Sequence, residues 1–96
     1  MATNAELKTT AKTVLRISHT KLDDEILRLI QTARRDLIRV GVKPAVANSE
    51  SDLLVDQAIV TYCLMNLTES ERKAELYQKS YESQIDGLRK HRDNYV

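Results

Sequence analysis

Turn-forming residues are scarce in this chain, which has two glycines and one proline in 96 residues. A fold built from many short strands needs frequent turns, and glycine and proline supply many of them. A chain with so few turn formers is expected to form a small number of long helices. At this length we expect one domain, residues 1–96, with a small core.

Hydrophobic residues follow the helical period most clearly in residues 22–40. The residues of this apolar stripe are Leu22, Ile26, Leu29, Ile30, Ala33, Leu37 and Val40. A period of 3.6 residues predicts an amphipathic helix with one buried face. Gly41 follows at the position where a left-handed residue commonly ends a helix, and Pro44 comes three residues later.

The same helix opens on three acidic residues, Asp23, Asp24 and Glu25. The helix dipole stabilises each negative charge in a first turn by about 0.3–1 kcal/mol. We therefore interpret the acidic triplet as a helix start, with Thr20 as the cap. Residues 18–20 would then form a corner between two helices.

Two more helices are expected before residue 70. Residues 5–15 carry one apolar stripe behind Asn4, which can cap a helix N-terminus. Residues 41–51 show no period and collect Gly, Pro, Asn and Ser, so we expect a loop. Residues 52–67, capped by a serine of that loop, are apolar over most of the helix circumference. Such a profile is typical of a central helix surrounded by neighbours.

The last helix is expected over residues 69–92, with Thr68 and Glu71 as a capping box. Its narrow apolar stripe consists of Leu76 or Tyr77, Tyr81, Ile85 and Leu88. At about 1.5 Å per residue this helix exceeds about 30 Å and can extend beyond the bundle. Gly87 inside it costs about 1 kcal/mol relative to alanine. The predicted fold class is therefore all-α, a small bundle of three to four helices with a long C-terminal helix.

The charge balance and cysteine content limit the class of protein. Lys and Arg number 15 against 14 Asp and Glu, so the formal net charge is +1. A free-standing nucleic-acid-binding protein usually has a clear excess of basic residues, and this chain has none. The single cysteine, Cys63, cannot form an internal disulfide, and the sequence shows no signal peptide or long apolar span. We therefore expect a soluble intracellular protein.

No catalytic, metal or cofactor site is predicted. Cys63 is a nucleophile candidate with His19 or His91 as base, but it lies in the most apolar helix, where a thiol is usually packing. One histidine and the acids at 23 and 24 lack a recognised metal-ligand spacing. Adjacent carboxylates on a helix also point about 100° apart, away from a shared substrate. Both glycines are isolated, so no phosphate-binding loop is present, and we expect no enzyme.

Arginines on the second helix are candidates for an interface. Arg28, Arg35 and Arg39 recur along one side of this helix, with Arg34 beside them. They could meet acidic groups of a partner subunit or nucleic acid. The alternative is a solvated face on which Asp24 supports Arg28 one turn away.

The last helix supplies the other candidates for an interface or channel surface. Tyr77 and Tyr81, one turn apart, serve either the core or a partner. Arg89, Lys90 and Arg92 form a basic group that also suits a helix C-terminus, where the dipole favours positive charge.

Five segments of the chain together resemble a known family. They are TVLRIS (13–18), LDDEILRLIQTARRDLI (22–38), VGV (40–42), LLVDQAIVTYCL (53–64) and LYQKSYESQIDGLR (76–89). In their order they resemble the small head–tail connector proteins of long-tailed bacteriophages, also called head-completion or adaptor proteins. The resemblance covers nearly the whole chain and rests on the order of elements more than on any one motif.

This resemblance implies a structural protein of the virion, at the head–tail junction, which is present in the host cytoplasm during assembly. Such proteins form a ring, commonly of about twelve subunits, beneath the portal. The ring extends the DNA channel and seats the stopper or tail. The implied partners are other copies of the chain, the portal protein, a stopper or tail-completion protein, and packaged DNA that passes without sequence-specific binding. No membrane partner or cofactor is implied, and the near-neutral charge suits a channel that does not hold DNA.

Two other functions remain open from the sequence. One is a small helical nucleic-acid-binding regulator that reads DNA with its second or third helix. The neutral charge balance and the apolar third helix both argue against it. The other is a helical adaptor that acts on one protein partner.

Overall fold

The computed structural model of the protein describes residues 3–49 and 52–90, and every regular element within them is an α-helix. The helices are, in chain order, α1 (Asn4–Leu15), α2 (Asp23–Arg39), α3 (Pro44–Ala47), α4 (Leu53–Leu67) and α5 (Glu71–Lys90). The all-α prediction, with its long C-terminal helix, is confirmed. The expected loop contains one helical turn, α3, because Pro44 at its first position has a backbone angle suited to a helix start.

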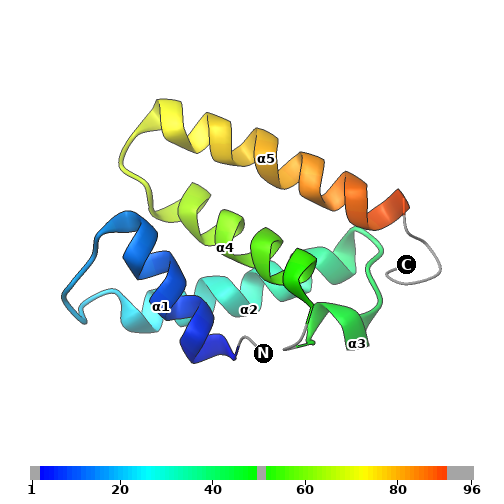
Figure 1. The fold of residues 1–96 in the computed structure, drawn as a ribbon, viewed down its shortest axis with the longest axis horizontal. Coiled ribbons are helices and arrows are strands. Elements are labelled where there is room, and N and C mark those ends of the chain that lie inside the picture. The colour runs from blue at the N-terminus through cyan, green and yellow to red at the C-terminus, as the bar shows by residue number, and fades with distance from the viewer. Residues whose placement is uncertain (1–2, 50–51, 91–96) are drawn as a thin grey trace.

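Helix α4 is the centre of the bundle. It packs against α1, α2 and α5, whereas α2 also packs against α1 and α3. Figure 1 shows α5 running along one side of α4, with α1 on the other side. This arrangement explains the sequence of α4, because a helix with neighbours on three sides has no wide polar face. The prediction of a central helix is confirmed.

The core is built from one stripe of each long helix and from residues around α3. Its buried members are Leu7, Ala11, Ile26, Ile30, Ala33, Leu37, Val42, Ala47, Val55, Ala58, Ile59, Cys63, Tyr81 and Leu88. In α5 the stripe passes through Tyr77, which is half-buried, and not through Leu76, which is 56% exposed. Each long helix thus buries most of the face that its apolar period predicts, whereas Val14, expected on the stripe of α1, is 51% exposed.

The predicted cap of α1 is wrong by one residue. Thr3, and not Asn4, caps α1: its Oγ1 accepts a hydrogen bond from the Glu6 N–H at 3.2 Å, and Glu6 Oε1 accepts one from the Thr3 N–H at 3.3 Å. Asn4 is already helical, and its side chain accepts hydrogen bonds from Arg34. The predicted cap of α2 is also wrong, because α2 starts after Leu22 with no side-chain cap and Thr20 contributes only its carbonyl.

The caps of α4 and α5 also differ from prediction. Asp52, and not a serine, caps α4, with its Oδ1 accepting from the N–H groups of Leu54 and Val55 at 2.9 and 3.2 Å. In α5 the Ser70 hydroxyl accepts from the Lys73 N–H at 3.3 Å, so the Thr68 capping box does not form. A carboxylate beside the first free N–H groups is a strong acceptor, which explains the choice of Asp52.

Two helices end in the same way but with different residues. After α2, Gly41 has φ of 108°, and the N–H groups of Gly41 and Val42 donate to the carbonyls of Ile38 and Leu37. This is the left-handed helix end that the glycine predicts. After α1, Arg16 takes the left-handed position with φ of 57°, which side chains other than glycine and asparagine seldom occupy.

We expect Gly87→Ala to raise the free energy of unfolding by about 0.5–1 kcal/mol. Gly87 lies inside α5, and a Cβ added there would meet no heavy atom within 4 Å. Alanine therefore gains helix propensity without a clash. Urea denaturation followed by circular dichroism measures the change. The contrasting variant is Gly41→Ala, which should lower stability because its φ of 108° strains an L-residue. Equal effects of the two variants would contradict this description of the helix ends.

Candidate interface

The described residues hold no recognisable catalytic or metal site. Among residues 3–49 and 52–90, no three His, Cys, Asp or Glu side chains gather in a group that could hold a metal ion. Cys63 is fully buried in α4, and burial raises the pKa of its thiol to about 12, so it stays protonated at neutral pH. His19 is exposed in the α1–α2 corner, where its Nδ1 accepts from the Lys21 N–H at 3.3 Å. His91 lies outside the described residues.

Within the described ranges, no helix combines the length and apolar character that a membrane span requires.

The acidic start of α2 joins two helices. Asp23 contacts two lysines of α1: its Oδ1 lies 2.6 Å from Lys12 Nζ, and its Oδ2 lies 3.5 Å from Lys8 Nζ. The hydrogen bond from Lys12 lowers the pKa of the Asp23 carboxyl below its ordinary value. Asp24 and Glu25 are exposed. The triplet is thus a helix start, and one of its members also fixes the angle of the corner. Lys8 and Lys12, one turn apart, were the sequence signal for this contact.

The three arginines proposed for an interface lie on the exposed side of α2. Arg39 pairs with Asp36, with Nη2 and Nε at 2.7 and 2.9 Å from Asp36 Oδ1. Within residues 3–49 and 52–90, no ion pair is recorded for Arg28 or Arg35, and the expected Asp24–Arg28 pair is absent. We call the exposed surface formed by Arg28, Gln31, Thr32 and Arg35 the α2 outer face.

Arg34 does not share that face, contrary to its expected place beside the other arginines. It is 4% exposed and points into the bundle. Its Nε and Nη2 donate to Asn4 Oδ1 at 3.2 and 2.9 Å, and its Nη1 donates to the carbonyls of Ala47 and Ser49 at 2.8 and 3.2 Å. The sequence signal for the burial of Arg34 was its position four residues after Ile30, on the apolar stripe of the helix. Arg34 thereby ties α2 to the start of α1 and to α3.

The aromatic candidates of α5 lie in different environments. Tyr81 is 5% exposed, and its hydroxyl donates to Asp36 Oδ2 at 2.7 Å. Its ring meets that of Tyr62 edge to face, with centroids 5.4 Å apart. Burial and the acceptor Asp36 raise the pKa of Tyr81. Tyr77, one turn before Tyr81, is half-buried beside a hollow that Val14 also lines.

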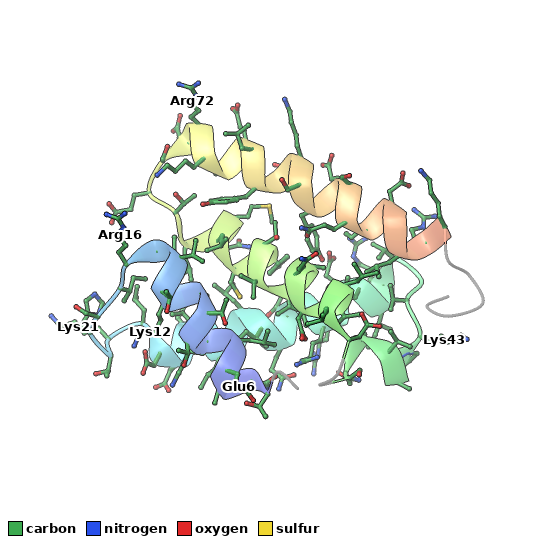
Figure 2. All side chains as sticks on the ribbon, in the orientation of Figure 1. Glu6, Lys12, Arg16, Lys21, Lys43 and Arg72 are labelled. Carbon is green, nitrogen blue, oxygen red and sulfur yellow. The ribbon has the colours of Figure 1, made fainter. Side chains whose placement is uncertain are left out.

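The basic candidates of α5 are exposed where they are described. Arg89 and Lys90 lie at the C-terminal end of the helix, and Lys90 Nζ is 3.5 Å from Asp86 Oδ2. Arg92 lies outside the described residues. This end carries Lys43 nearby, whereas Arg16, Lys21 and Arg72 point outward at the other end of the molecule (Figure 2). Positive charge is therefore spread over both ends.

A groove that the sequence did not predict lies over α4, between α1 and α5. Its volume is about 540 Å³, and its lining residues are Leu7, Thr10, Leu53, Asp56, Gln57, Val60, Thr61 and Gln84. We call it the α4 groove. Five of its eight lining residues belong to α4, so this helix forms the floor, and α1 and α5 form the walls. Leu53 is 77% exposed at this surface.

Two buried acceptors in the α4 groove have no partner. Asp56 Oδ1 and Gln84 Oε1 are inaccessible to solvent and make no hydrogen bond among the described residues. Asp56 as a whole is 8% exposed, and burial raises the pKa of its carboxyl despite the attraction of Arg34. An unpaired buried acceptor destabilises the isolated subunit, because it has lost water without gaining a donor. The sequence signal for this buried acid was a carboxylate in the first turn of an apolar helix.

One comparison with known proteins identifies a family for this helical chain. Residues 7–94 match the family model described as phage connector protein, from α1 to beyond the end of α5. Comparisons with curated proteins and with solved structures gave no match. The family match confirms the resemblance seen in the order of elements and gives the protein a structural connector role in a phage particle, in contact with other head or tail proteins. The chain belongs to the phage connector protein family.

Proposed function

We propose that the whole chain acts as one helical domain that assembles into a ring beneath the portal of a long-tailed phage. The ring would extend the DNA channel and provide the seat for the stopper or tail. The observation that carries this proposal is the family match over residues 7–94, nearly the full chain. By the same resemblance the ring has about twelve subunits and closes with cyclic symmetry.

The exposed surface of the subunit supports a self-assembling role. Leu53 and Leu54 are 77% and 47% exposed near the α4 groove, and Val14 and Leu76 are 51% and 56% exposed elsewhere. Subunit contacts that cover such side chains stabilise the folded state through assembly. A head-to-tail ring also needs two unlike surfaces on each subunit. The α4 groove and the α2 outer face are two such surfaces.

The charge pattern supports passage of DNA over binding of DNA. The net charge is +1, and the exposed side of α5 mixes Arg72, Lys73 and Lys79 with Glu75 and Glu82. A surface that neutralised many phosphates would hold the duplex by releasing its counterions. We therefore assign the surface candidates Arg28, Arg35, Arg39, Arg89, Lys90 and Arg92 to contacts between proteins or to a channel wall that DNA passes. No enzymatic step is part of this function.

Native mass spectrometry across a concentration series tests the ring directly, with negative-stain images of the largest species. The full chain is measured alone and with the portal protein of its own phage. We expect closed rings of about a dozen subunits with an open centre. A chain that stays monomeric or dimeric in both samples would contradict the proposal.

Reversing two charges of the α2 outer face is expected to impair assembly. The double variant Arg28→Glu/Arg35→Glu should raise the concentration for half-assembly at least about tenfold, since a like-charge contact at an interface costs several kcal/mol. The free energy of unfolding of the monomer should change by less than about 0.5 kcal/mol, because both side chains are exposed. Analytical ultracentrifugation and urea denaturation measure the two quantities.

The matched control is Arg72→Glu/Lys79→Glu. These residues are also exposed and seven positions apart, but they lie on α5. The control should assemble as the wild type does. Normal rings from the α2 variant, or an equal loss of assembly in both variants, would show that the α2 outer face is not part of the interface.

A further inference from the structure

The α4 groove continues past its described lining toward the end of α5. A second hollow of about 230 Å³ is lined by Leu54, Gln57, Gln84, Gly87 and Leu88, and it shares Gln57 and Gln84 with the groove. A Cβ at Gly87 would meet no heavy atom within 4 Å, so this part of the wall is open. Together the two hollows form one trough along α4, with exposed Leu53 and Leu54 beside it.

The chemistry of the trough defines what it can hold. Its leucine and valine side chains favour an apolar surface, whereas Asp56, whose Oδ1 has no hydrogen-bond partner among the described residues, places a negative charge in the lining. A ligand suited to this lining combines a positive charge with an apolar stem. Arginine does so, because its guanidinium carries a positive charge on a chain of methylene groups. Positive charge also offsets the cost of burying the Asp56 carboxylate.

The α2 outer face offers that chemistry on another surface of the same chain. Arg28 and Arg35 are exposed, lie two turns apart on one side of α2, and have no recorded ion pair within the described ranges. Two turns correspond to about 10.5 Å along the helix, so one face presents both guanidinium groups together. The opposite face of α2 packs against α1, α3 and α4, and the α4 groove opens between α1 and α5. A subunit therefore cannot place its own α2 outer face in its own groove.

We infer that the α4 groove of one subunit receives the α2 outer face of a second copy of this chain, with the positive charge of Arg28 or Arg35 lying against the Asp56 carboxylate. This inference rests on the proposed ring and specifies its subunit contact. The contact joins two unlike surfaces, so each subunit is left with one free groove and one free face until a ring closes. Exposed Leu53 and Leu54 lie against the neighbour's α2.

Disulfide trapping tests this contact in the assembled full-length protein. Two variants are made, Leu53→Cys/Arg28→Cys and Leu53→Cys/Arg35→Cys, each of which keeps one of the two arginines. The native Cys63 is fully buried, so it remains in place and wild-type protein serves as the background control. Under a mild oxidant at least one variant should give a ladder of covalent oligomers on a non-reducing gel. The corresponding variants with only one added cysteine serve as controls, because one disulfide per subunit cannot link more than two subunits.

The matched control is Leu76→Cys/Arg35→Cys, because Leu76 is an exposed leucine of α5 that does not line the trough. It should give no ladder. Rings that form normally but give no ladder with either Leu53 variant would overturn this inference and leave the ring itself intact. A wild-type chain that forms no ring, alone or with its portal protein, would overturn both.

A second pair of variants tests the groove without cysteine chemistry. Leu53→Arg should raise the concentration for half-assembly at least about tenfold, because it places a second positive charge where the neighbour's arginine enters. Leu76→Arg is the matched change at an exposed leucine outside the trough. It should change the concentration for half-assembly less than about threefold. Equal shifts would overturn the inference. If the groove instead receives a segment of the portal protein, Leu53→Arg rings form normally but fail to bind the portal.

Asp56→Asn should make the isolated subunit more stable but its rings weaker, which separates the two effects of this residue. Burial raises the pKa of Asp56, so its charged form destabilises the free subunit at pH 7 and its neutral form does not at low pH. The variant should therefore unfold at higher urea than wild type at pH 7. This gain should shrink as the pH falls through the raised pKa of Asp56 and should be gone below the ordinary carboxyl pKa of about 3.9. Its rings should be at least about threefold weaker at pH 7. A variant that is less stable and assembles normally would overturn the role of Asp56.

Discussion

Replacing Arg34 with alanine is expected to lower the free energy of unfolding by about 3–4 kcal/mol, a large part of the 5–15 kcal/mol typical of a small domain. The side chain is 4% exposed and donates to Asn4 Oδ1 and to the carbonyls of Ala47 and Ser49. Alanine removes those donors together and leaves a void. Urea denaturation followed by circular dichroism measures the loss.

Two further variants show whether the hydrogen bonds of Arg34 cause this effect. Arg34→Lys keeps the charge but replaces the planar fork with one ammonium group, so it should lose about half as much. Arg35→Ala removes the adjacent but exposed arginine and should cost less than about 0.5 kcal/mol. Similar losses from Arg34→Ala and Arg35→Ala would contradict the buried position of Arg34.

We expect Ile59→Ala to be the other strongly destabilising change, with a loss of about 2–5 kcal/mol. Ile59 is fully buried on the central helix, among core residues contributed by its neighbours. Truncation removes three carbons where the surrounding helices α1, α2 and α5 cannot all close in together. Thermal unfolding followed by circular dichroism would show the loss as a lower Tm.

The neighbouring residue provides the control for Ile59. Val60 is half-buried and lines the α4 groove, so Val60→Ala opens onto solvent and should cost about 1 kcal/mol or less. A conservative variant, Ile59→Val, should cost about 0.5–1.5 kcal/mol. If Val60→Ala cost as much as Ile59→Ala, α4 would be rotated from the position described.

Periodicity was sufficient to predict the helices because each one buries a stripe. The stripe of residues 22–40 became the buried face of α2, and the nearly uniform apolar character of residues 52–67 became the central α4. The helix ends were predicted less well. At the start of α1, Thr3 and Asn4 are both good caps, and the choice depends on backbone angles one residue apart.

Contacts between distant segments could not be predicted in the same way. Arg34 is buried because Asn4 and Ala47 supply acceptors, and these residues are 30 and 13 positions away. The sequence gives its charge, which favours solvent, but not the acceptors that overcome this preference. The α4 groove depends on the spacing of α1 and α5 about α4, which no periodicity records. Asp56 was visible as an acid in an apolar helix, yet its missing donor appears only after the three helices are placed.

The attachment of α5 affects the order in which the native state opens. Among the helices, α5 packs mainly against α4, and the Tyr81 hydroxyl gives it one hydrogen bond to Asp36 of α2. An element held by one neighbour separates at a lower free energy than one held by several, so amide hydrogens of α5 exchange with solvent before those of α4. Such partial opening moves one wall of the α4 groove while the contacts of α1, α2 and α4 persist. The subunit can thus widen its binding surface during assembly by releasing only the part of the core that Tyr81 and Leu88 of α5 contribute.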